Sequence, residues 1–124
     1  MQAAPQQVVE VVPEVVPAGP YLEIVESGAH ILLVAQPELL VGRLDETSGI
    51  EPEVDVTPHG GLDKGVSRRH AKLLHEGRAW FVFDLDSTNG TQVNGKEVTP
   101  KTRTSINDGD KLTFGELEMI FHAG

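Results

Sequence analysis

From Tyr21 onward, the sequence is a series of short apolar runs, rich in β-branched residues, each of which ends in turn-forming residues. Short runs closed by Gly, Pro, Asn, Asp or Ser are typical of strands joined by tight turns. No stretch carries the apolar stripe of an amphipathic helix over more than about two turns. The pattern predicts an all-β fold, an antiparallel β-sandwich of roughly ten or eleven strands. The strands that the pattern places lie at 21–25, 31–34, 38–43, 54–56, 69–75, 79–85, 91–93, 111–115 and 116–122.

The first twenty residues, MQAAPQQVVEVVPEVVPAGP, have a different composition. They combine Val-Val pairs and Glu with Pro5, Pro13, Pro17 and Pro20, and they show no period of 2 or 3.6. Proline fixes φ and removes a backbone donor, so each of these positions interrupts a strand or a helix. We expect residues 1–20 to form a disordered linker and residues 21–124 to form one domain, with an edge strand at VVEVV as the alternative.

Length, charge and cysteine content exclude several classes of protein. At 124 residues the chain is long enough for one core, and its lack of cysteine excludes disulfides and thiolate metal sites. It contains neither an apolar run of membrane-spanning length nor a signal-peptide pattern. A net charge of −9 disfavours sequence-independent binding to nucleic acid. We therefore expect a cytoplasmic protein without a membrane or nucleic-acid partner, although it has one local basic cluster: Lys64, Arg68, Arg69 and Lys72.

Two polar segments interrupt the strand pattern. Residues 43–67 contain only one brief strand candidate, and compact domains keep a connection of this length mainly where it has a function. Residues 84–96, DLDSTNGTQVNGK, follow directly after the apolar run AWFVF. Within them Asn94 and Gly95 suit a two-residue hairpin turn, because both residue types tolerate positive φ.

A calcium loop is one possible function of residues 84–96, but the spacing of the residues does not support it. An EF-hand needs oxygen ligands at loop positions 1, 3 and 5, Gly at position 6 and Glu at position 12. Started at Asp84, the loop lacks both the Gly and the Glu; started at Asp86, it places Glu97 at position 12 but Gly90 at position 5. The histidines form no metal-ligand spacing either. We expect no metal and no cofactor.

A hydrolase is a second possible class, because Ser67, His70 and Asp84 or Asp86 are the residue types of a nucleophile, a base and an orienting acid. However, no G-x-S-x-G elbow surrounds Ser67, and a Ser-x-x-His spacing is common by chance. A hydrogen bond that braces a loop is the simpler role for His70.

Four motifs occur in a fixed order along the chain. They are Gly42-Arg43 at a strand end, VSRRHA at 66–71, DSTNGTQVNG at 86–95 and INDGDKLTFG at 106–115. In identity, order and spacing they resemble the forkhead-associated (FHA) domain family, and the resemblance covers nearly the whole chain after the linker. It implies an FHA/SMAD-like antiparallel β-sandwich, whose loops at one end bind a phosphothreonine in a partner protein. It implies no catalysis, and we expect the isolated domain to be a monomer.

The resemblance assigns ligand contacts to five residues. Arg43 matches the arginine that contacts the phosphate, a role suited to a guanidinium that donates several hydrogen bonds and never loses its charge. Ser67 matches a hydroxyl donor to the same phosphate, and Arg68 occupies the next position of that loop. Thr88 resembles a second hydroxyl donor, and Asn89 resembles the side chain that binds the ligand backbone.

The resemblance also implies a set of residues that support the site without contacting the ligand. Gly42 is the small residue that lets the following arginine reach outward, and His70 is a buried brace for the serine loop. Gly90 permits a turn, while Asn94 and Gly95 form a hairpin turn that props the site.

The function that these motifs predict is phosphothreonine-dependent protein–protein interaction in signalling. Asp84 and Asp86 would repel a phosphate, so we assign them to turn hydrogen bonds. The alternative function is a structural scaffold that binds partners regardless of phosphorylation. Degenerate members of the family in that role tend to lose the arginine or the serine, and this chain keeps both Arg43 and Ser67. Residues 46–65 hold no motif that would identify the partner.

Overall fold

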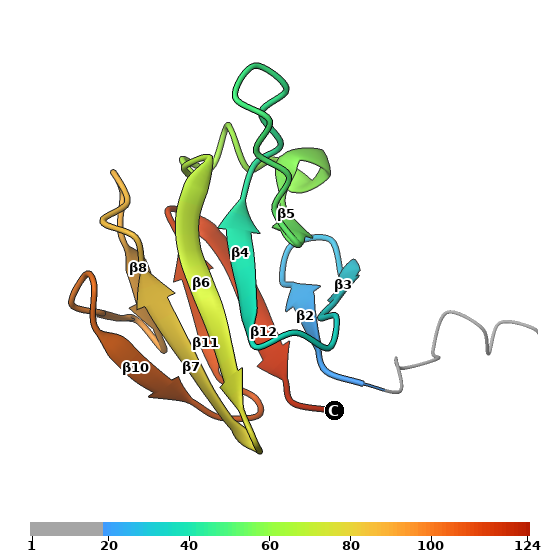
Figure 1. Cartoon of the computed structure of the whole chain (residues 1–124), viewed down its shortest axis with the longest axis vertical. Coiled ribbons are helices and arrows are strands. Elements are labelled where there is room, and N and C mark those ends of the chain that lie inside the picture. Colours follow the sequence, from blue (N-terminus) through green and yellow to red (C-terminus); the bar gives the residue numbers. More distant parts are fainter. Residues whose placement is uncertain (1–18) are drawn as a thin grey trace, which may run out of the picture.

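The fold is a sandwich of two β-sheets (Figure 1), seen in a computed structural model that describes residues 19–124. The predicted linker and its alternative edge strand therefore lie almost entirely outside the described residues. The described part contains eleven strands and one short 3₁₀-helix, and the sequence-based prediction of an all-β sandwich is confirmed. Within residues 19–124, no helix has the length and apolar character needed to cross a membrane.

The two sheets contain five and six strands. The order of the five-stranded sheet is β10-β7-β6-β4-β5, and the order of the six-stranded sheet is β3-β2-β12-β11-β8-β9. All strand pairs are antiparallel except β4 and β5, which run parallel. The first sheet consists of β4 (Glu38–Gly42), β5 (Val54–Asp55), β6 (Arg69–Glu76), β7 (Ala79–Asp84) and β10 (Arg103–Ile106). The second consists of β2 (Tyr21–Ile24), β3 (His30–Leu32), β8 (Thr91–Val93), β9 (Lys96–Glu97), β11 (Lys111–Phe114) and β12 (Leu117–His122).

Alternation along the strands builds the core between the sheets. In β7, Trp80 and Val82 are buried, whereas Phe81 and Phe83 are half-buried on the outer face. Fully burying a large apolar side chain contributes roughly 1.5–3 kcal/mol relative to leaving it exposed. The largest side chains that are buried without measurable exposure come from both sheets: Leu22, Leu39, Leu73, Leu112, Phe114, Met119 and Phe121.

The strand register gathers four connections at one end of the sandwich. The end of β4 and the end of β7 both lie beside the start of β6, because Gly42 pairs with Arg69 and Asp84 pairs with Ala71. The connections 43–53, 56–68 and 85–90 and the turn after β11 therefore meet at this end, the upper end in Figure 1. We call it the loop end. The 56–68 connection includes the 3₁₀-helix η2 (Thr57–His59).

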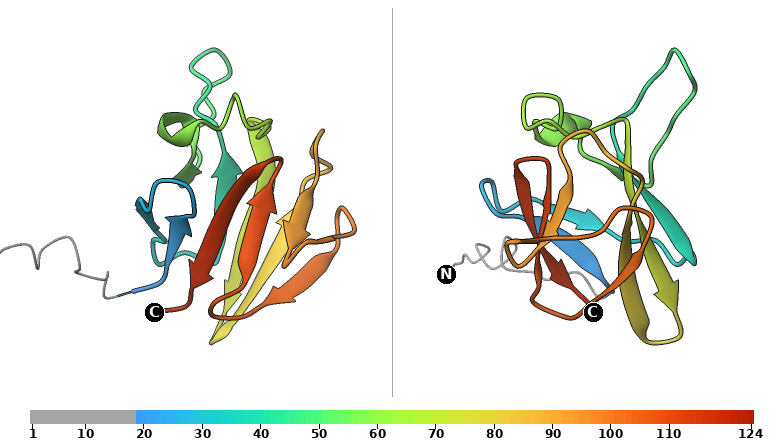
Figure 2. Two further views of the ribbon diagram at one scale, coloured as in Figure 1. Left: turned by 180° about the vertical axis from the view of Figure 1, so that it is seen from behind. Right: turned by 90° about the vertical axis from the view of Figure 1, so that its left-hand side faces the viewer.

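The two ends of the described chain meet at the opposite end of the sandwich. A Cβ atom placed on Gly124 would lie only 3.0 Å from the backbone nitrogen of Pro20. Figures 1 and 2 show the start of β2 and the C-terminus together at the lower end, away from the loop end.

Candidate functional site

The end of β4 lies unusually close to the backbone of the 56–68 connection. The register of β4 against β6 shifts between Val41 and Gly42, and a Cβ atom on Gly42 would lie 1.8 Å from the carbonyl oxygen of Arg68. No side chain larger than hydrogen fits there without moving backbone. This close approach allows the Arg43 backbone N–H to donate to the Arg68 carbonyl oxygen at 3.1 Å.

The Arg43 side chain is half-buried and fixed at one nitrogen. Its Nε–H donates to the carbonyl oxygen of Val66 at 2.7 Å. Since this bond uses Nε alone, the two terminal amino groups keep their donors for a ligand. None of the ion pairs within residues 19–124 involves Arg43. Its positive charge is therefore held in place and is not neutralised by a neighbouring carboxylate.

His70 braces the loop that carries Ser67. The ring is fully buried, its Nδ1 accepts the Ser67 backbone N–H at 3.0 Å, and its Nε2 lies 2.9 Å from the Gly90 carbonyl oxygen. A carbonyl oxygen can only accept, so Nε2 carries the hydrogen and the ring is in the neutral Nε2–H form. Burial lowers the pKa of His70, against the opposing effects of the Gly90 carbonyl and the Asp84 carboxylate.

The same two hydrogen bonds argue against the hydrolase alternative. A general base must have a ring nitrogen free to take the proton of the nucleophile. In His70, one nitrogen accepts from the Ser67 backbone and the other donates to the Gly90 carbonyl, so neither is available to the Ser67 hydroxyl. His70 is placed to hold backbone, and its position does not support proton transfer.

The buried carboxylate of Asp84 fixes the conformation of the 85–90 loop. This carboxylate accepts hydrogen bonds from the Ser87 hydroxyl at 2.7 Å, the Ser87 backbone N–H at 3.0 Å and the Thr91 hydroxyl at 2.6 Å. Burial on its own raises the pKa of Asp84, but the hydrogen bonds from Thr91 and Ser87 outweigh it and the pKa is lowered. Asp84 therefore makes the turn hydrogen bonds expected of it. Asp86 is exposed and instead takes a positive φ of 62°, which Asp tolerates better than most residues.

Thr88 and Asn89 stand at the exposed tip of the 85–90 loop and connect it to the 56–68 connection. The Thr88 backbone N–H donates to the Ser67 hydroxyl at 3.4 Å, and Asn89 Nδ2 donates to the Gly65 carbonyl oxygen at 2.9 Å. The Asn89 amide has a second N–H and an accepting oxygen beyond this bond. Thr88 and Asn89 therefore lie on the same surface as Ser67.

Arg68 is placed differently from the other candidate contacts. Its side chain is 63% exposed, and its Nε lies 3.6 Å from Asp45 Oδ2 in the 43–53 connection. Lys64 and Lys72 of the predicted basic cluster also form ion pairs, with Glu26 at 3.3 Å and with Glu38 at 3.0 Å. Three of the four cluster residues thus form separate ion pairs in the fold.

Two glycines complete the site, and their roles were not assigned from the sequence. Gly115 has a φ of +62°, and a Cβ there would lie 2.6 Å from the Lys64 carbonyl oxygen and 2.8 Å from that of Gly65. A Cβ on Gly65 would lie 2.6 Å from Asn89 Nδ2. Both glycines allow the 56–68 connection to pack closely against its neighbours. In the sequence, Gly65 stands in a polar, turn-rich segment and Gly115 ends the motif INDGDKLTFG, but neither position reveals this close packing.

The Asn94-Gly95 turn lies apart from the candidate ligand contacts. Both residues have positive φ, 53° and 83°, and they join β8 to β9 as the expected two-residue hairpin. The Asn94 side-chain oxygen accepts the Lys111 backbone N–H at 2.9 Å. The returning strand brings the Glu97 carboxylate within 2.8 Å of where a Cβ on Gly90 would be, and Gly90 itself has a φ of +83°.

Comparison with known proteins identifies the family. Residues 39–115 match the family model named FHA domain, and the chain belongs to this family. It is 32% identical over 108 residues to an oxoglutarate dehydrogenase inhibitor of Corynebacterium diphtheriae, covering 87% of this chain and 68% of that protein. It is 37% identical over 105 residues to the FHA domain-containing protein FhaB of Mycobacterium tuberculosis, covering 82% of this chain and 61% of FhaB.

Solved structures share the fold over most of the described chain. One, from a study of phosphothreonine-dependent FHA domain interactions, is 27% identical with a TM-score of 0.67 and covers 86% of this chain and 98% of its own. Another, the FHA domain of FhaA in complex with the intracellular domain of Rv3910, is 28% identical with a TM-score of 0.65 and covers 83% and 99%. FHA domains are interaction modules, and the fold of this chain is theirs.

Proposed function

We propose that this domain binds phosphothreonine-containing segments of partner proteins through its loop end. The observation that carries the proposal is the placement of Arg43. Its guanidinium is held by one backbone hydrogen bond, has no carboxylate partner in the described residues, and lies at the loop that carries Ser67. A fixed, unneutralised guanidinium beside hydroxyl donors is suited to a phosphate dianion.

Each remaining contact adds one element of recognition. The Ser67 and Thr88 hydroxyls donate to the phosphate oxygens, and the Asn89 amide binds the backbone of the ligand. Arg68 contributes a second positive charge after it exchanges Asp45 for the phosphate. Since His70 and Asp84 already fix the loops, little ordering entropy is lost when the ligand binds.

The relatives support this reading. One structural neighbour comes from work on phosphothreonine-dependent FHA interactions, and another is EmbR of Mycobacterium tuberculosis in complex with a low-affinity phosphopeptide. The oxoglutarate dehydrogenase inhibitor is, by its name, a regulator of an enzyme. By analogy, the function proposed for this chain is regulation through binding, without catalysis, metal or cofactor.

The proposal also covers the extent, oligomeric state, cellular location and partner class of the domain. Residues 21–124 form the binding module, which acts as a monomer in the cytoplasm and has no nucleic-acid partner. The net charge of −9 supports the last point, because it repels a polyanion while leaving the local positive charge of Arg43 for a single phosphate.

Titration calorimetry of Arg43→Ala with a phosphothreonine peptide tests the proposal. Hydrogen bonds to charged groups contribute about 1.5–3 kcal/mol, so we expect affinity to fall about tenfold to more than a hundredfold. The exposed Arg78, in the turn between β6 and β7 at the opposite end, is a matched control, and Arg78→Ala should bind like the parent. Equal affinity of the parent for phosphorylated and unphosphorylated peptides would favour the phosphorylation-independent scaffold instead.

A further inference from the structure

The surface beside Asn89 is recessed. A cavity of about 270 Å³ is lined by Asp63, Lys64, Gly65, Asn89, Gly115 and Glu116. It begins at the side chain proposed to hold the ligand backbone. A bound segment that passes over Asn89 therefore also passes over this cavity, provided that the proposed function is correct.

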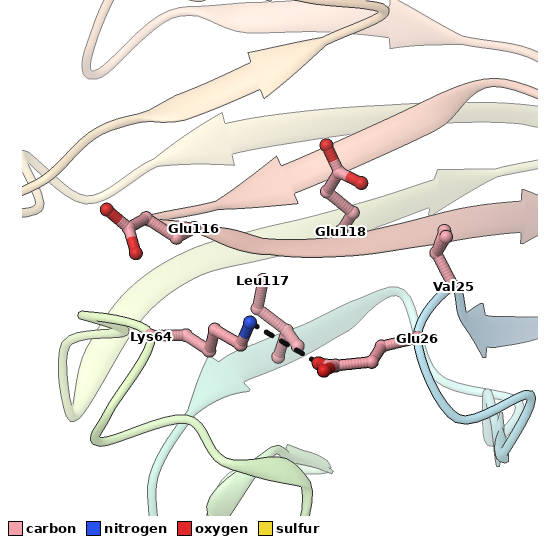
Figure 3. Close-up of a pocket in the computed structure, with 6 residues that line it drawn as sticks. All are labelled: Val25, Glu26, Lys64, Glu116, Leu117 and Glu118. Atoms are coloured by element: carbon pink, nitrogen blue, oxygen red, sulfur yellow. Dashed lines mark ion pairs between the residues drawn. The ribbon is translucent and has the colours of Figure 1, made fainter.

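A second depression adjoins the first. It has a volume of about 180 Å³ and shares Lys64 and Glu116 with the first cavity, and its further lining comes from β12 and the turn after β2 (Figure 3). Val25 forms part of this wall and is 47% exposed. Together the two depressions form a groove that leads from Asn89 across the start of β12. We call it the Asn89 groove.

The floor of the Asn89 groove is held by backbone contacts. The Glu116 backbone N–H donates to the Lys64 carbonyl oxygen at 2.7 Å, and the Gly115 backbone N–H donates to the Gly90 carbonyl oxygen at 3.0 Å. Gly115 also has no room for a side chain against Lys64 and Gly65. The shape of the groove is thus set by backbone contacts next to those that position Asn89.

Carboxylates outnumber ammonium groups along the groove, where Lys64 is the one basic lining residue. The Lys64 ammonium lies 3.3 Å from Glu26 Oε1 and is directed toward it, whereas the Glu116 carboxylate points the opposite way (Figure 3). Glu118 pairs with Lys111 at 3.3 Å. Among the ion pairs of residues 19–124, none involves Asp63 or Glu116.

We propose that the Asn89 groove receives a lysine or arginine side chain of the bound segment, so that the domain selects phosphothreonine segments that carry a basic residue on the side crossing Asn89. This inference rests on the proposed function. Asp63 and Glu116, which line the depression next to Asn89, supply the carboxylates for the cationic head. An acidic residue of the ligand at the same place meets repulsion.

A metal ion fits the groove less well than a basic side chain. The carboxylates of Asp63 and Glu116 are exposed, and residues 19–124 contain no group of three His, Cys, Asp or Glu side chains arranged to hold a metal. A long side chain attached to a ligand already held at Arg43 does not need such a cage, because the phosphate contacts keep it nearby.

A peptide scan measures the preference directly. Each position on both sides of the phosphothreonine is changed in turn to Lys or to Glu in an alanine background, and the dissociation constants are measured by calorimetry. We expect Lys to bind about threefold to tenfold more tightly than Glu at one or two neighbouring positions on one side only. The ratio should shrink as salt is raised, because exposed charge pairs are screened.

Variants assign that preference to the groove. Asp63→Asn with Glu116→Gln should remove most of the Lys-over-Glu ratio, and Asp63→Lys with Glu116→Lys should invert it. The control is Glu38→Gln with Glu76→Gln, which removes the same charge from surface ion pairs at the far end of β4 and β6. This control should keep the ratio of the parent.

The outcomes separate the two proposals. If the parent binds phosphothreonine peptides but the scan is flat, favours Glu, or is unaffected by the Asp63 and Glu116 substitutions, the groove inference is wrong and the proposed function stands. If the parent binds phosphorylated and unphosphorylated peptides alike, the proposed function is wrong and the groove inference falls with it. Circular dichroism of each variant verifies that a lost preference reflects the groove and not unfolding.

Discussion

The two loops that flank Arg43 and Ser67 are held in opposite ways. The 85–90 loop stands on the buried carboxylate of Asp84 and is bonded to the buried ring of His70 through Gly90. The 43–53 connection projects beyond the sheets (Figure 1) and is held by surface contacts, such as the backbone bridge between Asp45 and Ile50. One loop is anchored to two buried polar groups, and the other is attached to the surface of the sandwich.

This difference predicts that the two loops tolerate mutation to different degrees. In the proposed function, recognition of a phosphate needs fixed donors, and the 85–90 loop would supply them from a network whose disruption would also destabilise the domain. The exposed residues 46–49 can change in sequence without loss of the fold, so substitutions there should not affect the proposed phosphate contacts. Four expected outcomes test this comparison, beginning with the largest effect.

The first prediction concerns the buried carboxylate. Asp84→Ala leaves the Ser87 and Thr91 donors without their acceptor, so we expect a loss of about 2–4 kcal/mol in the free energy of unfolding. Urea unfolding followed by circular dichroism measures it. Asp45→Ala, the same change in the 43–53 connection, leaves the exposed Thr47 and Ser48 donors open to water, so the unfolding midpoint should change little. Equal losses from the two variants would remove the distinction between the loops.

The second prediction compares two serines. Ser67→Ala removes a hydroxyl donor to the phosphate while keeping the backbone N–H that binds His70, so affinity for a phosphothreonine peptide should fall about fivefold to thirtyfold. Ser48→Ala in the 43–53 connection removes a hydroxyl that bonds only Asp45, at 2.6 Å, and should bind the phosphopeptide as the parent does. Calorimetry on both folded variants is the measurement.

The third prediction concerns pH. The pKa of His70 is lower in the folded protein than its ordinary value of 6.5, so the unfolded chain takes up a proton first as pH falls. Stability should be fully present above about pH 6.5 and decrease as pH drops toward the folded pKa, by at most about 1.4 kcal/mol per pH unit. Asp84, with its lowered pKa, adds a further loss only below its ordinary value of 3.8.

Urea midpoints between pH 7.5 and pH 5 measure this slope, and His70→Gln is the control that removes the titrating ring. The half-buried His59 of η2 provides a matched substitution, because His59→Gln leaves both hydrogen bonds of His70 in place. A slope that survived in His70→Gln would assign the effect to other groups.

The fourth prediction has the smallest effect. Replacing residues 46–49 with a Gly/Ser sequence of equal length should change the melting temperature by less than about 2 °C, since these residues are exposed. Affinity for a minimal phosphothreonine peptide should also be retained. Differential scanning calorimetry tests the first outcome, and a large loss of stability would show that this loop is structural after all.

The strands that could be predicted from the sequence were those in which buried and more exposed side chains alternate. β7 and β12 read directly from AWFVFD and LEMIFH, because every second side chain enters the core. β10 was not placed, since in RTSI only Ile106 is buried and the other side chains give no apolar pattern. β9 has two exposed residues and exists because the Asn94-Gly95 turn returns the chain.

Candidate site residues could be chosen from the sequence where a proposed role depends on residue type, and not where it depends on close contact. Arg43 and Ser67 carry motifs, whereas the need for Gly65 and Gly115 appears only once the Lys64 and Gly65 carbonyls lie against them. The basic cluster was misleading for the same reason: residues close in sequence, such as Arg68 and Lys72, pair with different carboxylates in the fold.

Pro20 and Gly124 lie next to each other, so both ends of the described chain leave the domain at the end opposite the loop end. Closely spaced termini favour insertion into a host protein and circular permutation. Joining Gly124 to Gly19 through a short spacer and opening the chain at the exposed Gly77-Arg78 turn would keep every strand intact. Such a permuted module could be fused to a reporter at its remote pole, leaving the phosphate loops unobstructed for use as a phosphorylation sensor.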